Sequence, residues 1–281
     1  MKKIQLRTIA LLCFLLFLHT NVFSQDPNFY IFLCFGQSNM EGQGVIEKQD
    51  SIVDGRFQVM QAITCSNLDR IKGQWYTAIP PLCQCGSGVS PADYFGKTLV
   101  ANLPDNIKVG VINVAVGGCD IRLFDKNLYQ DYDSTYKEKW FSDKIDAYNG
   151  NPYQTFIDLA KLAQKEGVIK GILLHQGESN TNDTNWPKYV KAVYNNILSD
   201  LSLHSESVPL LAGEVVHADQ NGVCASMNAI IDKLPETIPT AYVISSKGCT
   251  AGPDNLHFNS EGYRMLGKRY GEKMLSLLKT K

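Results

Sequence analysis

The stretch YIFLCFGQSNMEG, from Tyr30 to Gly42, passes directly from six mostly apolar residues to Gly-Gln-Ser-Asn. A continuous apolar run of this length is typical of a strand that is buried on both faces of a parallel sheet. Gly36 permits a tight turn after such a strand. Ser38 would then lie in the first turn of a helix, where unpaired backbone N–H groups can bind an oxyanion. Ser38 is therefore a candidate nucleophile, although a serine in this position can also serve only as a helix cap.

Further apolar runs follow the first one and alternate with helical patterns. The runs are Lys108–Ala115, Ile169–His175, Pro209–Val215 and Ala241–Ser245. The helical patterns lie at residues 90–102, 151–167, 185–201 and 225–234, and a last one begins at Ser260, which we expect to be its N-cap. The alternation predicts an α/β fold, a doubly wound three-layer sandwich with a mainly parallel, five-stranded sheet of the flavodoxin-like kind.

Two long segments do not follow this alternation, from Val45 to Val89 and from Asp120 to Gly150. Loops of this length usually carry function. The sequence contains no internal repeat and no linker, and the length suits one large α/β domain. We therefore predict a single domain from residue 25 to residue 281.

The first 24 residues are predicted to be a secretory signal peptide. Lys2, Lys3 and Arg7 give a positively charged start, and Ile9–Leu18 is a short apolar core. Val22-Phe23-Ser24 is the expected cleavage site. This order is typical of signal peptides. The apolar core is shorter than the roughly 20 residues that a membrane-spanning helix needs. The sequence therefore predicts a secreted or periplasmic protein that is not inserted in a membrane after cleavage.

The charge pattern argues against two classes of partner. The formal net charge is −1, and no run of basic residues follows the leader. Proteins that bind nucleic acid or an anionic membrane surface usually carry such runs. The sequence therefore favours neither partner.

Seven of the eight cysteines follow the leader, since only Cys13 lies within it. An odd number leaves at least one free thiol in a secreted chain. Cys34 lies in a predicted buried strand, so we expect it to be free. We expect Cys224 to pair with Cys249, and Cys65 to pair with Cys83 or Cys85.

Three more short motifs lie after predicted strands, at the carboxyl edge of the sheet, where ligands bind in open α/β folds. Paired glycines, Gly117 and Gly118, follow the second strand, and His175-Gln176-Gly177-Glu178 ends the third. Asp254 and His257 precede the last helix. Their spacing lets a carboxylate reach the imidazole Nδ1 and leaves Nε2 as a base. Each motif alone is also compatible with an ordinary turn, but together they supply the parts of an activated nucleophile.

These four motifs resemble the four conserved blocks of SGNH-type hydrolases. Within that superfamily the chain is most similar to the sialate O-acetylesterase group and to the acetylxylan esterases of carbohydrate esterase family six. The resemblance runs from about Tyr30 to the C-terminus. The Gly-Gln-Ser of the first block and the Gln176 of the third block, in place of the usual Gly-Asp-Ser and Asn, are both features of that group.

The resemblance implies a role for each matched residue. Ser38 would be the nucleophile, His257 the base and Asp254 the acid that orients it, with Glu178 as the alternative triad acid. The oxyanion would be bound by the backbone N–H groups of Ser38 and Gly118 and by the Gln176 amide. No metal or cofactor is implied.

The implied function is a secreted carbohydrate O-acetylesterase that works through an acetyl-serine. Its partner would be an acetylated carbohydrate, with acetylxylan as the first substrate class and acetylated sialic acid as the second. A general or lipase-like esterase and a carbohydrate-binding protein on an inactive hydrolase scaffold are the alternatives. Candidate substrate contacts are Gln37, Asn39, Trp75, Trp140 and Trp186, where the tryptophans could stack on sugar rings.

Overall fold

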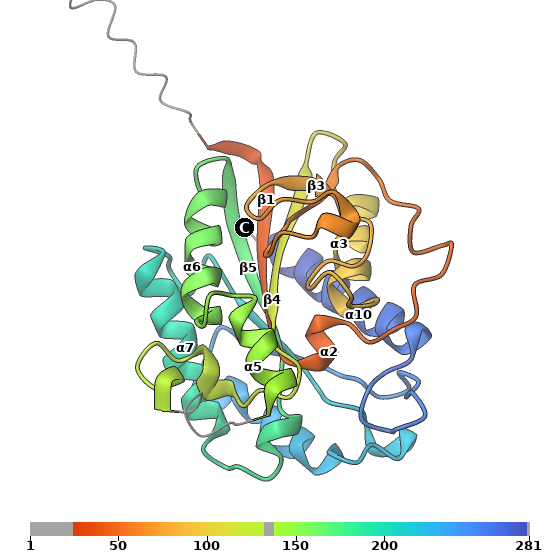
Figure 1. Ribbon diagram of the computed structural model, residues 1–281, viewed down its shortest axis with the longest axis vertical. Coiled ribbons are helices and arrows are strands. Elements are labelled where there is room, and N and C mark those ends of the chain that lie inside the picture. The colour runs from red at the N-terminus through yellow and green to blue at the C-terminus, as the bar shows by residue number, and fades with distance from the viewer. Residues whose placement is uncertain (1–24, 132–137, 280–281) are drawn as a thin grey trace, which may run out of the picture.

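The computed structural model describes residues 25–131 and 138–279, so the predicted signal peptide at 1–24 lies outside the described residues. Helices cover both faces of one sheet (Figure 1). The strands are β1 (Asp26–Gly36), β2 (Phe57–Met60), β3 (Trp75–Thr77), β4 (Lys108–Ala115), β5 (Gly167–His175), β6 (Leu210–Gly213) and β7 (Ala241–Ile244). The α-helices are α2 (Ser38–Glu41), α3 (Pro91–Asn102), α5 (Lys139–Asp146), α6 (Pro152–Ala163), α7 (Trp186–Asp200), α8 (Asn228–Ile231), α9 (Leu234–Thr237) and α10 (Ser260–Leu278). No helix among the described residues combines the length and apolar character needed to cross a membrane.

The predicted α/β sandwich is confirmed, but the sheet of the described residues has seven strands rather than five. Their order is β3-β2-β4-β1-β5-β6-β7. All neighbouring strands are parallel except β2 and β3, which are antiparallel. The five predicted strands are β1, β4, β5, β6 and β7. The two additional strands, β2 and β3, lie between Val45 and Val89, where the sequence predicts a long loop, because runs of only four and three residues carry little periodic signal.

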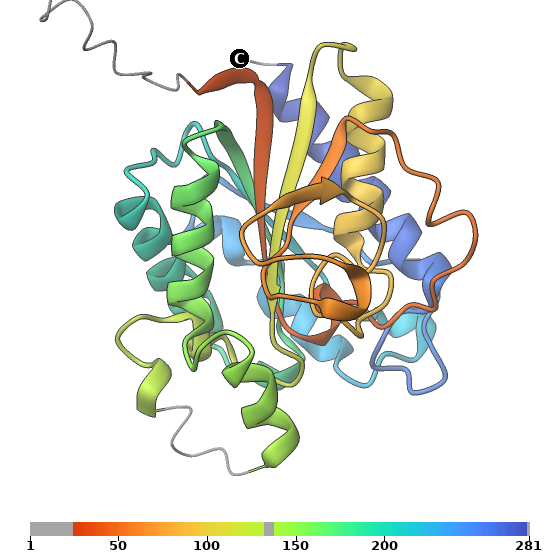
Figure 2. The ribbon, with the colours of Figure 1, turned by 45° about the horizontal axis from the view of Figure 1, so that its top comes forward.

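The central strand β1 packs against helices on both faces. Ile31, Leu33 and Phe35 point into the apolar core on one side of the sheet, whereas Phe32 and Cys34 point into the core on the other. This is the period-two alternation of strand side chains. Helices α6 and α7 cover the first face, and α3 and α10 cover the second (Figure 2). The arrangement explains why the strand reads as a continuous apolar run.

Two helix predictions need correction. The pattern at 225–234 is not one helix but a 3₁₀ turn (Ala225–Met227) followed by the short helices α8 and α9. The N-cap of α10 is Asn259, whose side chain accepts the N–H of Gly262 at 2.8 Å, whereas Ser260 Oγ donates to the backbone oxygen of Val45. Asparagine and serine are both good N-caps, and the sequence alone does not decide between neighbours.

One of the two expected disulfides is present. Cys65 pairs with Cys85, which is one of the two partners expected for it, and Cys34 is buried and free as predicted. The expected pair of Cys224 and Cys249 is wrong, because both thiols are free. Cys224 Sγ contacts the backbone oxygen of Glu178, whereas Cys249 Sγ contacts the guanidinium of Arg269. The segments that follow β6 and β7 therefore hold these cysteines against different partners.

Asp93 makes the stability of the fold sensitive to pH. It is fully buried in the first turn of α3 and accepts hydrogen bonds from the backbone and side chain of Ser90. Burial raises the pKa of its carboxyl from 3.8 to about 7, although the bonds from Ser90 oppose this. The folded state then holds a proton between about pH 4 and pH 7 that the unfolded state releases, so stability falls as pH rises through this window.

We expect Asp93→Asn to remove this dependence, because asparagine accepts the same hydrogen bonds without titrating. The wild-type free energy of unfolding, relative to that of the variant, should fall by up to about 4 kcal/mol between pH 4 and pH 7. Denaturant unfolding of both proteins across this range measures the difference. Parallel curves would contradict the prediction.

Candidate active site

Ser38 is the first residue of α2, a single helical turn directly after β1. Gly36, the last residue of β1, has φ of +149°, and a Cβ there would lie 2.0 Å from the backbone oxygen of His175. The N–H of Gln37 donates to that same oxygen at 3.0 Å. The close approach of β1 and β5 at this point therefore requires glycine. It places Ser38 at the carboxyl edge of the sheet, 8% exposed.

Ser38, His257 and Asp254 form a continuous chain of hydrogen bonds. His257 Nε2 lies 2.8 Å from Ser38 Oγ, and His257 Nδ1 lies 2.6 Å from Asp254 Oδ2. The other carboxylate oxygen of Asp254 accepts the backbone N–H groups of Leu256 and His257. The segment between β7 and α10 thus brings the imidazole onto a serine that is 219 residues away in the sequence.

The environment of Asp254 keeps its carboxyl ionised. Burial acts to raise the pKa of Asp254, but hydrogen bonds from the backbone and side chain of His257 and from the backbone of Leu256 outweigh it, so the pKa lies below its usual value. A carboxylate facing Nδ1 holds the ring proton there. The lone pair of Nε2 then faces Ser38, which is the tautomer that a general base needs.

Glu178 lies beside the hydrogen-bonded residues Ser38, His257 and Asp254 but makes no hydrogen bond with His257. Its Oε1 accepts from Asn39 Nδ2 and lies 3.8 Å from His175 Nε2. Burial raises the pKa of Glu178, opposed by the hydrogen bond from Asn39 and by the charge of His257. Burial also lowers the pKa of His175 to about 3, so this ring is neutral at physiological pH. Of the two candidate triad acids, the structure places only Asp254 against the imidazole.

Asn39 links three parts of the site. Its Nδ2 also donates to the backbone oxygen of Leu256, while its Oδ1 accepts from the N–H of Phe258 and from the hydroxyl of Tyr263. The side chain is fully buried and does not line the cavity beside Ser38. It therefore holds the His257 segment against α2 and is not placed to contact a substrate, contrary to expectation.

Two backbone N–H groups from residues that line the cavity at Ser38 are available to an anion. Among the described residues, the N–H groups of Ser38 and Gly118 have no acceptor. Gly118 has φ of +82°, and a Cβ there would lie 2.9 Å from the Trp140 ring. Glycine is thus required at this position. The neighbouring N–H of Gly117 donates to Glu41 Oε2, and the other carboxylate oxygen, Oε1, pairs with Lys144, so the glycine turn is held in place.

Gln176, the third expected oxyanion donor, is turned away from the cavity. Its amide nitrogen lies within hydrogen-bond distance of Gln37 Oε1, Cys119 O and Asn180 Oδ1, and its oxygen accepts from Trp186 Nε1. These partners exceed the two hydrogens that the amide nitrogen carries. Gln176 is 1% exposed and is not among the residues that line the cavity.

Gln37 instead faces the cavity, next to Ser38. Its amide oxygen accepts from Gln176 Nε2 and from the N–H groups of Gly177 and Ser179. These three contacts fix which end of the amide is the oxygen. The Gln37 amide nitrogen has no partner in the part of the chain that the structure describes. An oriented and unused N–H donor therefore lies beside the serine.

The cavity at Ser38 and His257 has a volume of about 380 Å³. Its walls include Gly117, Gly118, Lys144 and Trp140, which is 48% exposed. Trp140 is thus the one expected tryptophan that the structure brings to the site. In residues 25–131 and 138–279, no group of three or more His, Cys, Asp or Glu side chains could hold a metal ion.

The other two tryptophans lie elsewhere. Trp186 is fully buried with its Nε1 bonded to Gln176, so it supports the site from behind and has no face for a sugar. Trp75 packs on Phe29 and donates to Glu166, near the start of β1 and of β5. That is the amino edge of the sheet, opposite Ser38. Neither side chain lies at the cavity beside Ser38, because an aromatic residue in a loop region is as readily packed as exposed.

A protein-family model described as carbohydrate esterase, sialic acid-specific acetylesterase, matches residues 28–276. The chain belongs to this family of carbohydrate esterases. Among curated proteins it is similar to a probable carbohydrate esterase of Arabidopsis thaliana, with 24% identity over 274 residues, 90% of this chain and 93% of that one.

The fold of this carbohydrate esterase family member is shared by solved structures. An Arabidopsis thaliana protein superposes with a TM-score of 0.65 at 22% identity, covering 89% of this chain and 99% of that one. The protein NanS gives 0.63 at 16% identity, covering 92% and 100%. A carbohydrate acetylesterase from Xanthomonas citri gives 0.61 at 18% identity, covering 89% and 57%.

Sequence reasoning missed Glu41 and Lys144, the ion pair that holds the glycine turn of this carbohydrate esterase. Glu41 lies within the opening stretch, three residues after Ser38, and its side chain is 4% exposed. An acidic residue beside a predicted nucleophile is a usable signal. Lys144 gives none, because it is one of two lysines on an amphipathic helix and nothing local distinguishes it from Lys139.

Proposed function

We propose that this protein is a serine carbohydrate O-acetylesterase, with residues 25–281 as one hydrolase domain. The observation that carries the proposal is the hydrogen-bonded chain of Ser38, His257 and Asp254, whose serine opens onto a cavity lined by unpaired N–H donors. Nucleophile, base, orienting acid and anion site are the parts that acyl transfer requires. Membership of a carbohydrate esterase family supports the same chemistry.

In the first half of the reaction, His257 Nε2 takes the Ser38 proton as Oγ attacks the acetyl carbonyl. The carbonyl oxygen becomes an oxyanion between the N–H groups of Ser38 and Gly118. The tetrahedral intermediate collapses when the bond between the acetyl carbon and the sugar oxygen breaks. His257 gives its proton to that oxygen, which leaves as a hydroxyl, and Asp254 stabilises the imidazolium between the two transfers.

In the second half, water takes the place of the sugar hydroxyl. His257 removes a proton from the water, which attacks the acetyl-serine, and the same donors hold the second oxyanion. Collapse releases acetate and returns the proton to Ser38. Each donor that meets the oxyanion contributes about 3 kcal/mol, or roughly a hundredfold or more in rate.

The third oxyanion donor is the amide nitrogen of Gln37 rather than that of Gln176. Gln37 lines the cavity, and its N–H₂ group is fixed in place and has no acceptor in the described residues. The N–H₂ group of Gln176 instead donates to neighbouring acceptors. Gln176 therefore acts as a positioning residue that holds the oxygen end of Gln37. Ser38 thus has a side-chain amide on each side of it in the sequence. The amide of Gln37 would donate to the substrate, whereas the amide of Asn39 donates to Glu178 and Leu256 and so holds the fold.

We expect Gln37→Glu to lower kcat by about 10²–10³-fold with little change in Tm. A carboxylate keeps an oxygen for the N–H groups of Gly177 and Ser179 but places a second oxygen where the donor stood. Gln176→Ala should lower Tm, since it unpairs buried groups, and should reduce kcat less than Gln37→Glu. Steady-state kinetics on an aryl acetate and thermal unfolding measure both. The reverse order of the two kcat losses, with Gln176→Ala stable, would assign the donor to Gln176.

The substrate class is proposed from the family and from the shape of the site. Acetylxylan is the first candidate and acetylated sialic acid is the second, with secretion supported by the leader at residues 1–24. Acetate release from acetylated xylan, pectin and sialoglycans ranks these substrates. A general esterase would prefer aryl acetates to every glycan in the panel. A carbohydrate-binding protein on an inactive scaffold would bind glycans without releasing acetate.

A further inference from the structure

Three adjoining hollows lead from the catalytic cavity to the surface of α10. The cavity at Ser38 shares Gln43 and His257 with a second hollow of about 290 Å³. That hollow shares Val45, Asn259 and Ser260 with a third one of about 910 Å³. The third hollow ends along the exposed side of α10 at Met265 and Lys268. We call the second and third hollows together the α10 groove.

The reaction chemistry fixes which part of a substrate lies on this side. His257 Nε2 must give its proton to the departing sugar oxygen, so the sugar leaves on the imidazole side of Ser38. The α10 groove begins at His257 and Asp254 and leads away from the glycine turn at Gly117 and Gly118. It is therefore the leaving-group side, and the acetyl group lies on the oxyanion side.

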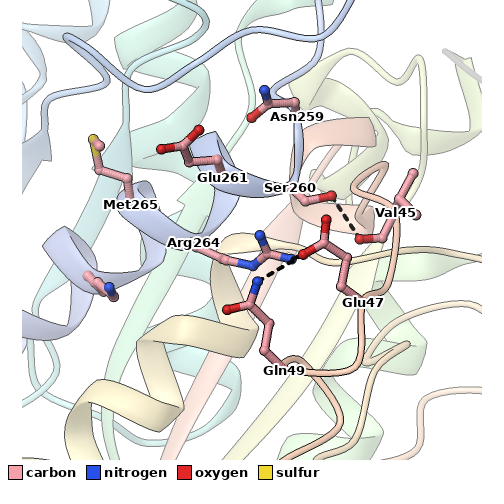
Figure 3. A pocket seen from close by; sticks show the side chains of 9 residues that line it. Val45, Glu47, Gln49, Asn259, Ser260, Glu261, Arg264 and Met265 are labelled. Atoms are coloured by element: carbon pink, nitrogen blue, oxygen red, sulfur yellow. Dashed lines mark hydrogen bonds and ion pairs between the residues drawn. The ribbon is translucent and has the colours of Figure 1, made fainter.

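The α10 groove is held in shape before any ligand arrives. Figure 3 shows Arg264 reaching across it to Glu47, and Ser260 bonded to the backbone of Val45. Arg264 also pairs with Asp50, which is fully buried and accepts from Tyr94. These contacts tie the loop after α2 to the helix. A groove that is already ordered costs less entropy to fill.

Its walls match the two kinds of surface on a sugar chain. Gln49 and Glu261 offer exposed amide and carboxylate groups for hydroxyls, and Lys268 adds an ammonium donor. Val45, 74% exposed, and Met265 offer apolar surface for the C–H faces of the rings. At about 910 Å³ the outer hollow is near the upper end of the roughly 300–1,000 Å³ range of small-molecule sites, so it extends well beyond one sugar ring.

We propose that the α10 groove binds the carbohydrate chain that carries the ester, so that the enzyme acts on acetyl groups within a polysaccharide rather than on an acetylated monosaccharide. This inference rests on the proposed esterase function. It adds a binding surface, with Glu261 and Lys268, about two turns apart on α10, as contacts to sugar units beyond the acetylated one.

The test compares two double variants with the wild type. Glu261→Ala/Lys268→Ala removes the groove contacts, and Glu272→Ala/Lys279→Ala is the matched control. Both pairs are an exposed Glu and Lys seven residues apart at the surface of the same helix region, and both leave the net charge unchanged. The control pair lies outside the groove. The substrates are acetylated xylan, acetylated xylose and 4-nitrophenyl acetate.

For the wild type, kcat/KM per ester should be at least about tenfold higher on the polymer than on acetylated xylose, since extra sugar units add contacts. The groove variant should lower the ratio of kcat/KM on the polymer to that on 4-nitrophenyl acetate by about tenfold, mainly through KM. The control variant should keep the wild-type ratio. With Ser38→Ala in the background, binding to unmodified xylan in affinity electrophoresis should weaken for the groove variant only.

The outcomes separate the two proposals. Equal efficiency on polymer and monosaccharide, or an unchanged ratio in the groove variant, overturns the groove while esterase activity stands. A similar fall in the ratio of kcat/KM on the polymer to that on 4-nitrophenyl acetate in both double variants also overturns the groove proposal, because the effect would not depend on the groove. No turnover of any ester by the wild type would overturn the esterase function, and the groove proposal with it.

Discussion

Ser38→Ala should reduce kcat for acetate release by about 10⁵-fold or more, the largest effect expected of any single substitution in this protein. The hydroxyl of Ser38 lies at the cavity with His257 Nε2 2.8 Å away to accept its proton, so it is the group that can attack an acetyl carbonyl. Without it, no acetyl-enzyme forms. The remaining donors would give only the residual rate of an oxyanion site that acts on water.

The fold should tolerate this change. Ser38 is small, and its hydroxyl bonds to the His257 ring rather than to the core. We therefore expect a Tm within a few degrees of the wild type and intact glycan binding. Acetate release from acetylxylan and from 4-nitrophenyl acetate, together with thermal unfolding, measures these expectations. A stable alanine variant that keeps a tenth of the wild-type kcat would refute the nucleophile, whatever the distance between the two side chains.

The sequence carried enough information to place this serine, because its signals were local. Five strands appear as apolar runs in the sequence. The motifs that follow β4, β1 and β5 lie side by side, because these three strands are neighbours in the sheet. The rule that sites lie at the carboxyl edge of such a sheet then brings Gly36, Gly118 and Gln176 together without any knowledge of the tertiary packing.

The features that the sequence did not predict depend on contacts between distant segments. Gln37 and Gln176 have the same side chain, and only the surrounding acceptors decide which one keeps a free N–H₂ group. Trp140 and Trp186 likewise differ in burial, 48% exposed against none, because of what packs on them. The α10 groove joins residues of the 43–49 loop to a helix more than 200 positions later in the sequence. Residue type and spacing do not encode such outcomes.

Asp254→Asn should lower kcat by about 10⁴-fold, the second largest effect that we expect. The carboxylate holds the proton on His257 Nδ1 at 2.6 Å and keeps the Nε2 lone pair toward Ser38. An asparagine can present its N–H₂ group to Nδ1 instead, which favours the opposite tautomer and places a proton on Nε2. The imidazolium of the transition state would also lose its counter-charge. Because the Asp254 side chain is about half exposed, we expect only a small change in Tm.

Glu178→Gln is the matched substitution, since it removes the other carboxylate of the site by the same exchange of oxygen for amide. Glutamine keeps an oxygen for Asn39 Nδ2, and Glu178 has no hydrogen bond to His257 to lose. Burial already raises the pKa of Glu178, so a neutral side chain suits this position. We expect kcat within about tenfold of the wild type, since only one longer-range charge interaction with His257 is lost. Kinetics of both variants on 4-nitrophenyl acetate decides between the acids, because a far larger loss in Glu178→Gln than in Asp254→Asn would make Glu178 the triad acid and leave Asp254 as a surface partner of the imidazole.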